Sequence, residues 1–277
     1  MSEHEVELSA GTVRYRDTGD GPPLVFVHGL MTDGTLWRKV IPRLEDRFRC
    51  IAPDWPLGSH PKPMRSDAQL TPPAVARLIG ELLDRLDLDG ATLVTNDTGG
   101  ALGQMLVAER PDRVGRLVLT PCDAFDNFLP RLFKPLEYAA RVPGGLTAFV
   151  QPLRVAALRR LPVAYGYLSK RPIPKEVTDA WLRPFMTDAG IRRDTRRFLR
   201  SVDSEDTLQA AARLGRFDRP VLIAWASEDK VFPLDHARRL AKIFPDARVE
   251  DIADSRTYVP EDQPERLAEL VRQFAAA

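Results

Sequence analysis

Asp97 has the sequence setting that most clearly suggests chemistry. It stands in the segment LVTNDTGGA (93–101), where an apolar strand pattern runs directly into a helical pattern. Small residues, Thr95 and Gly99, lie two positions before it and two after it, as a very tight strand–helix turn requires. A helix N-terminus directs backbone N–H groups toward such a side chain and favours negative charge there. Asp97 is therefore either a reactive carboxylate on this turn or simply a helix N-cap.

The elements around Asp97 alternate between strand and helix patterns. A predicted hairpin over 5–16 turns at Ala10-Gly11, and short apolar runs predict buried strands at 24–27, 48–52, 91–95 and 114–120. Helical spacing predicts helices at 35–44, 72–86 and 101–109. This alternation indicates an α/β fold with a mostly parallel central sheet and helices on both faces.

The alternation stops in the middle of the chain and then resumes. Residues 126–213 contain helix-like segments broken by many prolines and no convincing buried strand. Strand and helix patterns return at 220–225, 234–243, 248–252 and 261–274. We therefore predict a core formed by residues 1–125 and 214–277, with 126–213 inserted as an α-helical cap, or lid. The range 126–215 has 16 Lys and Arg against 9 Asp and Glu, which indicates a solvated basic surface or a lid that attracts an acidic ligand.

Composition excludes several other classes of protein. The 277 residues carry a formal net charge of +1, which gives no general attraction to nucleic acid or to an anionic membrane. No apolar run approaches the roughly 20 residues that span a bilayer. The acidic N-terminal residues do not look like a secretory signal, and two cysteines are too few for a disulfide framework. We expect a cytoplasmic protein with a small-molecule substrate, either a monomer or a homodimer.

Several short motifs, taken together, resemble the α/β-hydrolase fold superfamily along nearly the whole chain. VFVHGL (25–30) resembles its strand-end His-Gly motif, LIAWASEDKVFP (222–233) the strand and turn that carry its acid, and DSRTYVPEDQPERL (254–267) its final loop and helix. The resemblance implies that Asp229 is the acid and that the backbone N–H groups of Leu30 and Thr98 form an oxyanion hole. An aspartate at the position of Asp97 resembles haloalkane dehalogenases and epoxide hydrolases. There the carboxylate, anionic at neutral pH, attacks carbon, and a histidine-activated water hydrolyses the resulting ester.

Two positions depart from that pattern. The final loop has Arg256-Thr257 where those families have a Gly-His pair, and threonine cannot act as a general base near neutral pH. The residue after the nucleophile is Thr98, where those families usually have tryptophan. The second half of the reaction therefore lacks its expected catalyst.

Another histidine could replace the missing base. His60 follows a predicted strand in the loop DWPLGSHP (54–61), at the edge of the sheet where active sites form, so it is either a relocated base or an ordinary loop residue. His28 belongs to the His-Gly motif, whose ring the resemblance implies holds loops together. His4 lies in a terminal segment, and His236 opens a helix near the surface.

Further polar residues could line the pocket. Asp123 follows the strand that ends at Thr120, at a place where some dehalogenases keep their acid, and Cys122 stands beside it. Tyr138, Tyr165 and Tyr167 of the lid either polarise a substrate oxygen, as epoxide-hydrolase tyrosines do, or simply pack. We predict that His28, Asp123 and Tyr138 contact the substrate.

Three functions fit these residues. The first is an Asp97-nucleophile hydrolase acting on a small apolar electrophile such as an alkyl halide or an epoxide. The second is a non-hydrolytic lyase, cyclase or isomerase that uses Asp97 as acid or base, and the third is a ligand-binding pseudoenzyme. The sequence has neither a His/Cys cluster nor a phosphate-binding glycine loop, so we expect no metal or organic cofactor.

Overall fold

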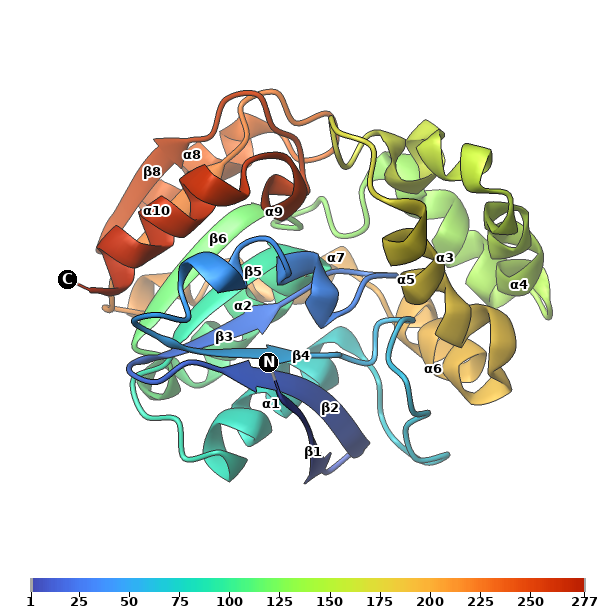
Figure 1. Ribbon diagram of the computed structural model, residues 1–277, viewed down its shortest axis with the longest axis horizontal. Helices are drawn as coiled ribbons and strands as arrows, with labels where there is room; N and C mark the ends of the chain where they lie inside the picture. The colour runs from blue at the N-terminus through green and yellow to red at the C-terminus, as the bar shows by residue number, and fades with distance from the viewer. Residues whose placement is uncertain (1, 277) are drawn as a thin grey trace.

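A computed structural model describes residues 2–276 and contains one eight-stranded sheet (Figure 1). The strand order is β1-β2-β4-β3-β5-β6-β7-β8, with antiparallel pairing of β1 with β2 and of β2 with β4, and parallel pairing elsewhere. The strands are β1 (Ser2–Leu8), β2 (Gly11–Thr18), β3 (Pro23–Val27), β4 (Arg49–Pro53), β5 (Thr92–Asp97), β6 (Arg116–Cys122), β7 (Val221–Trp225) and β8 (Ala247–Asp251). The predicted mostly parallel α/β sheet is confirmed.

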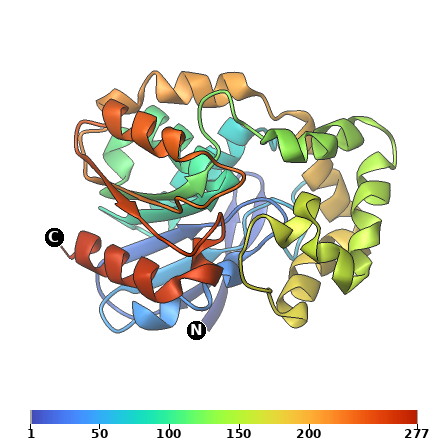
Figure 2. The same cartoon turned by 90° about the horizontal axis from the view of Figure 1, so that it is seen from above.

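Helices cover both faces of this sheet (Figure 2). One face carries α1 (Pro72–Arg85), α2 (Thr98–Glu109) and α8 (Leu234–Ile243), and the other carries α10 (Pro264–Ala275). Strands β5 and β7 are buried along their whole length because helices exclude water from both sides. Helix α1 begins as its sequence predicts, since the Thr71 hydroxyl accepts a hydrogen bond from the Ala74 N–H and prolines occupy the first two positions.

A group of short helices stands beyond the carboxyl ends of the strands, at the right of Figure 1. It includes α3 (Lys134–Arg141), α4 (Gly145–Val150), α5 (Lys175–Thr187) and α6 (Ala189–Arg200). Single turns, two of which have Pro152 or Pro162 in their first two positions, connect α4 to α5, whereas α5 and α6 meet at Asp188. Helix α7 (Ser204–Ala211) falls within the range expected for the lid but packs against α2 of the core. The insertion above the sheet is therefore shorter than 126–213.

Two predicted helices differ in the structure, in both cases at a proline. The segment 35–44 forms two single turns, η1 (Gly34–Trp37) and η2 (Ile41–Arg43), with Pro42 inside the second. The final predicted helix is divided into α9 (Val259–Asp262) and α10, which starts at Pro264. Proline favours the first turn of a helix, and Pro42 and Pro264 each lie in the first turn of a new one.

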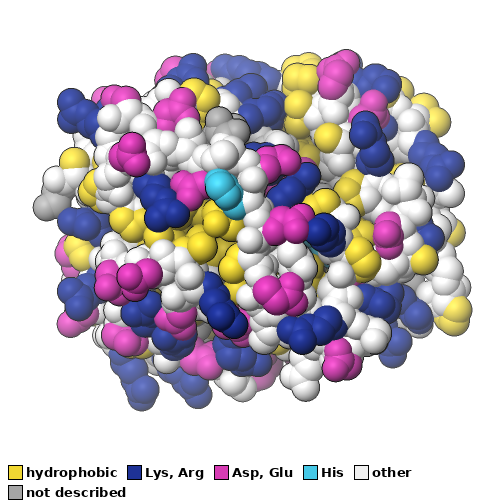
Figure 3. Space-filling model, turned by 60° about the horizontal axis from the view of Figure 1, so that its bottom comes forward, with side chains coloured by type: hydrophobic (Ala, Val, Ile, Leu, Met, Phe, Trp, Pro, Cys, Tyr) yellow, Lys and Arg dark blue, Asp and Glu magenta, His cyan; other side chains and the backbone are white. Residues whose placement is uncertain are grey.

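The molecular surface carries charge of both signs. Figure 3 shows Lys and Arg interspersed with Asp and Glu over one face, in keeping with the formal net charge of +1. Within residues 2–276, no helix combines the length and the apolar character that crossing a membrane requires.

Candidate active site

The turn between β5 and α2 holds Asp97 in a strained backbone conformation. Its φ of 57° and ψ of −133° lie outside the regions that residues other than glycine ordinarily adopt. Its side chain makes no capping hydrogen bond to α2, so the structure does not show the simple N-cap alternative. The backbone N–H groups of Leu30 and Thr98 instead act on the carboxylate by lowering its pKa, against the effect of burial. These are the two amides that the sequence assigns to the oxyanion hole.

Glycines allow other chain segments to approach Asp97 closely. A Cβ atom added at Gly29 would lie 2.1 Å from the Asp97 Oδ2 atom. A Cβ atom at Gly99 would lie 2.4 Å from the Val27 carbonyl oxygen, which explains the small residue two positions after Asp97. The turn therefore requires glycine at both positions.

The electrostatic setting of Asp97 differs from the sequence expectation of a fully anionic carboxylate. Burial raises the pKa of Asp97 to about 7, and the nearby Asp229 carboxylate adds to this increase. The N–H groups of Thr98 and Leu30 act in the opposite direction, since they stabilise the anion. Near neutral pH, both protonation states of Asp97 are therefore populated.

Asp229 and Thr257 form a hydrogen-bonded pair. The Thr257 hydroxyl donates to Asp229 Oδ2 at 2.7 Å, while Asp229 Oδ1 accepts from the backbone N–H groups of Val231 and Phe232 at 2.6 and 2.7 Å. The Thr257 carbonyl accepts from the Asn96 side chain at 2.6 Å, which ties the final loop to β5. Burial raises the pKa of Asp229 to about 6. Thr257 thus donates to Asp229 the hydrogen bond that a histidine base at this position would donate.

Asp123 is a third buried carboxyl group at this edge of the sheet. It accepts hydrogen bonds from the Thr98 hydroxyl at 3.3 Å and from the Leu129 N–H at 3.1 Å. Burial raises the pKa of Asp123 well above its usual range, with a further contribution from the charge of Asp97. Cys122 is also buried and packs against Gly100.

A cavity of ≈ 60 Å³ opens above Asp97. Most of its lining is apolar and comes from residues 129–168. The lining residues are Leu30, Met31, Asp97, Thr98, Leu129, Pro130, Phe133, Leu136, Phe149, Val150, Leu153, Val163, Ala164, Tyr165, Leu168 and Tyr258. Such a lining suits a small apolar molecule held against one carboxylate.

Neither candidate histidine lines this cavity. The His60 Nε2 atom lies 3.5 Å from Asp194 Oδ2 of α6, and its ring is buried between the β4 loop and the insertion. The structure therefore does not bring the predicted substitute base to Asp97. His28 accepts a hydrogen bond from the Trp55 N–H at 2.8 Å, so it joins two loops rather than contacting a substrate. Burial lowers the pKa of His28 to about 4, which keeps the ring neutral.

The tyrosines also differ from prediction. Tyr138 is 61% exposed and does not line the cavity, so its predicted substrate contact is not formed. Tyr165 lines the cavity, but its hydroxyl donates to the Met31 carbonyl at 3.0 Å.

Tyr258 was not among the sequence candidates. It is fully buried, it lines the cavity with Asp97, and its hydroxyl has no hydrogen-bond partner within residues 2–276. The one feature of the sequence that could have indicated Tyr258 is its position directly after Thr257 in the final loop.

The comparisons with known proteins agree with this geometry. A family model described as the alpha/beta hydrolase fold matches residues 22–264. The chain belongs to the α/β-hydrolase family. This α/β hydrolase is 30% identical over 280 residues to haloalkane dehalogenase 2 of Mycobacterium bovis, covering 96% of this chain and 92% of that protein. A solved haloalkane dehalogenase from Bradyrhizobium elkani is 26% identical, with a TM-score of 0.79 and 99% of both chains covered.

These matches place the α/β hydrolase in the haloalkane dehalogenase group. It is also 28% identical over 284 residues to cis-3-alkyl-4-alkyloxetan-2-one decarboxylase of Shewanella oneidensis, covering 99% of this chain and 88% of that protein. Among residues 2–276, no group of three or more His, Cys, Asp or Glu side chains is arranged to hold a metal ion.

Proposed function

We propose that Asp97 is the nucleophile of an enzyme acting on a small apolar electrophile, such as an alkyl halide or an epoxide. The observation that supports this most strongly is the carboxylate itself, which lines an apolar cavity and whose anion the Leu30 and Thr98 amides favour. A carboxylate needs no base to attack alkyl carbon, and water exclusion raises its reactivity.

In the first step, an Asp97 oxygen forms a bond to the substrate carbon while the bond to the leaving atom breaks. A halide departs as the anion, whereas an epoxide oxygen remains attached and requires a hydrogen bond or a proton. The unpartnered Tyr258 hydroxyl is the donor that best suits this oxygen, because it lines the same cavity.

The second step, hydrolysis of the ester, has no matching catalyst. The Thr257 hydroxyl donates a hydrogen bond to Asp229, and both Asp229 oxygens already accept hydrogen bonds. Neither group can readily remove a proton from water. We therefore expect the ester at Asp97 to persist with halide and epoxide substrates.

The test is rapid-mixing measurement of halide release from a panel of short chloroalkanes and bromoalkanes. The proposal predicts a burst of about one halide per protein followed by very slow turnover. The matched control is Asp97→Asn, which keeps the shape and should show no burst. If Asp97→Asn gives the same burst as the natural protein, the nucleophile is another group.

The Thr257–Asp229 pair also favours a second candidate, a non-hydrolytic lyase reaction, because such a reaction needs no activated water. The oxetan-2-one decarboxylase among the relatives illustrates the chemistry by its name. If Asp97 opened an oxetan-2-one at C4, a free carboxylate would form, and loss of CO₂ would create the alkene and expel Asp97. Water takes no part in this sequence.

Gas-phase product analysis separates the two candidates. Catalytic formation of CO₂ and alkene from a cis-dialkyl oxetan-2-one, lost in Asp97→Asn, would support the lyase. Absence of those products together with a halide burst would support the alkylating hydrolase type. Saturable ligand binding with neither result would favour a ligand-binding protein without catalysis.

A further inference from the structure

A second cavity, of ≈ 240 Å³, lies at the junction between the insertion and the final loop. Six of its lining residues are cationic, and none of those lining residues is Asp or Glu. The cations are Arg159, Arg160, Lys170, Arg171, Lys175 and Arg256. All of these cations except Arg256 belong to the basic excess of residues 126–215, and the chemistry at Asp97 does not use them.

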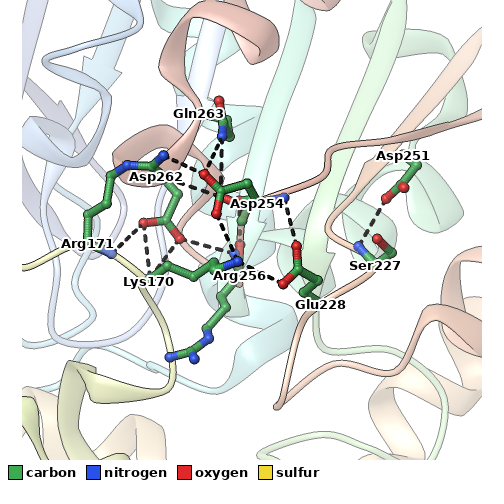
Figure 4. Close-up of polar contacts among 10 residues, drawn as sticks. Lys170, Arg171, Ser227, Glu228, Asp251, Asp254, Arg256, Asp262 and Gln263 are labelled. Atoms are coloured by element: carbon green, nitrogen blue, oxygen red, sulfur yellow. Dashed lines mark hydrogen bonds and ion pairs between the residues drawn. The ribbon is translucent and has the colours of Figure 1, made fainter.

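Four of these cations have carboxylate partners behind the cavity wall. Asp179 pairs with Arg159 and Lys175, and Asp254 pairs with Lys170 and Arg171. Figure 4 shows the second group, in which Lys170 also contacts Glu228. These contacts join the insertion to the core and position the cations.

A further carboxylate, that of Asp262, binds backbone groups of the same segments. It accepts hydrogen bonds from the N–H groups of Lys170, Arg171 and Arg256. Even with this group counted, six cations face four neighbouring carboxylates. The six cations therefore outnumber the carboxylates that contact them or their backbone N–H groups.

Arg160 and Arg256 are the cations that lack a carboxylate partner among the described residues. Arg160 is exposed and makes no side-chain hydrogen bond or ion pair within residues 2–276. Arg256 donates to the Gly166 carbonyl at 2.9 Å, and its side chain extends away from the carboxylates in Figure 4. A concave surface with an excess of cationic side chains focuses an attractive field on anions, and guanidinium groups match the oxygens of phosphate and carboxylate.

We propose that this second cavity binds a phosphate or carboxylate group. Two sources share that chemistry, a free oxyanion and the anionic end of a longer molecule. The second source is considered because this cavity adjoins the apolar cavity above Asp97, with Tyr165 in the wall of both. Arg256 also directly precedes Thr257, which donates a hydrogen bond to Asp229. An anion bound at Arg256 would therefore lie next to the loop that carries Thr257.

Isothermal titration of the full chain with inorganic phosphate tests the proposal. We expect saturable binding that weakens as salt increases, since screening reduces the field of the cavity. Arg160→Gln should weaken phosphate binding about tenfold, and so should Arg256→Gln. Arg160→Gln is the safer variant, because the Arg160 side chain holds no other group in place.

Arg154→Gln is the matched control, because Arg154 is an exposed arginine of the same insertion that does not line the second cavity. Its phosphate affinity should stay within about twofold of the natural protein. Octyl phosphate distinguishes the two sources: tighter binding than phosphate indicates a longer molecule, and equal binding indicates a free oxyanion. No saturable phosphate binding, or equal weakening in Arg160→Gln and Arg154→Gln, would overturn the proposal.

Discussion

At the scale of single residues, Asp97 combines two opposing influences. Burial and the neighbouring Asp229 raise its pKa to about 7, which favours the protonated acid. The Leu30 and Thr98 amides favour the anion, which is the form that attacks carbon. The balance leaves a carboxylate that is poorly solvated, and so reactive, but only partly ionised at neutral pH.

This balance predicts a pH dependence for alkylation of Asp97. Below the pKa the reactive anion decreases about tenfold per pH unit, so the rate should rise from pH 5 to 7 and level off above about pH 8. The measurement is the initial halide burst across that range, at constant ionic strength. A rate that is already constant from pH 5 upward would mean that Asp97 is ionised throughout.

Tyr258 should matter for one class of substrate only. Tyr258→Phe removes the unpartnered hydroxyl and leaves the ring, so epoxide opening should slow about 100-fold because the oxygen loses its donor. A departing halide needs no proton, so its burst should change little. Tyr138→Phe is the control, since Tyr138 is exposed and lies outside the cavity. Equal effects on both substrate classes would assign Tyr258 a packing role.

Residues that belong to short local motifs could be predicted from the sequence. The position of Asp97 at a strand end follows from local spacing, whereas the roles of Leu30 and Thr98 were implied by the family resemblance of the motifs around them. The distance between His60 and Asp97, by contrast, depends on how α6 packs against the β4 loop. Long-range packing also decides which tyrosine reaches the cavity. The sequence therefore favoured Tyr138, which is exposed, over Tyr258, which is buried.

At the scale of elements, the β5–α2 turn depends on glycines contributed by two different segments. Gly99 belongs to α2 and lets that helix approach β3, whereas Gly29 follows β3 and lies against the Asp97 carboxylate. The strained backbone of Asp97 persists because these close contacts leave it no alternative position.

Gly29→Ala should therefore impair Asp97 without unfolding the protein. The added methyl group would lie 2.1 Å from Asp97 Oδ2, so the carboxylate would have to move. We expect the halide burst to slow about 100-fold, as small displacements of reacting groups commonly do. Gly215→Ala is the control, because the nearest atom to its added methyl group is 3.6 Å away. An unchanged burst in Gly29→Ala would show that the position of this carboxylate is not critical.

Element types were predicted well where a periodic apolar pattern was uninterrupted. Helix α1 and strands β3 and β5 are examples, since their apolar residues follow one period throughout. Prolines produced the errors, because Pro42 and Pro264 divide segments whose apolar spacing alone suggests one helix. The attachment of α7 to α2 is a long-range contact that no local pattern reports.

At the scale of the whole molecule, the active site is a source of instability. Asp97, Asp123 and Asp229 are buried carboxyl groups with raised pKa values, and burial is the largest cause of each increase. A group whose pKa is higher in the folded state binds protons more readily there than in the unfolded chain. The folded state is therefore destabilised as pH rises from about 4 toward 7.

Asp97→Asn should relieve part of this destabilisation. At pH 8 the variant should be more stable than the natural protein by about 2–4 kcal/mol, and near pH 4 the two should be nearly equal. Urea unfolding at both pH values measures the difference. Asp20→Asn, at an exposed loop position, should show no comparable gain. A loss of stability in Asp97→Asn at pH 8 would contradict the raised pKa of Asp97.

The central claim is that Asp97 attacks carbon and that Thr257 leaves the resulting ester without a base to hydrolyse it. Intact-protein mass spectrometry after incubation with chloroalkanes and epoxides, followed by peptide mapping, tests it most directly. The account predicts a persistent adduct on Asp97, no adduct in Asp97→Asn, and conversion to released alcohol when Thr257→His restores a base beside Asp229. Steady alcohol release by the natural protein, or an adduct on another residue, would contradict it.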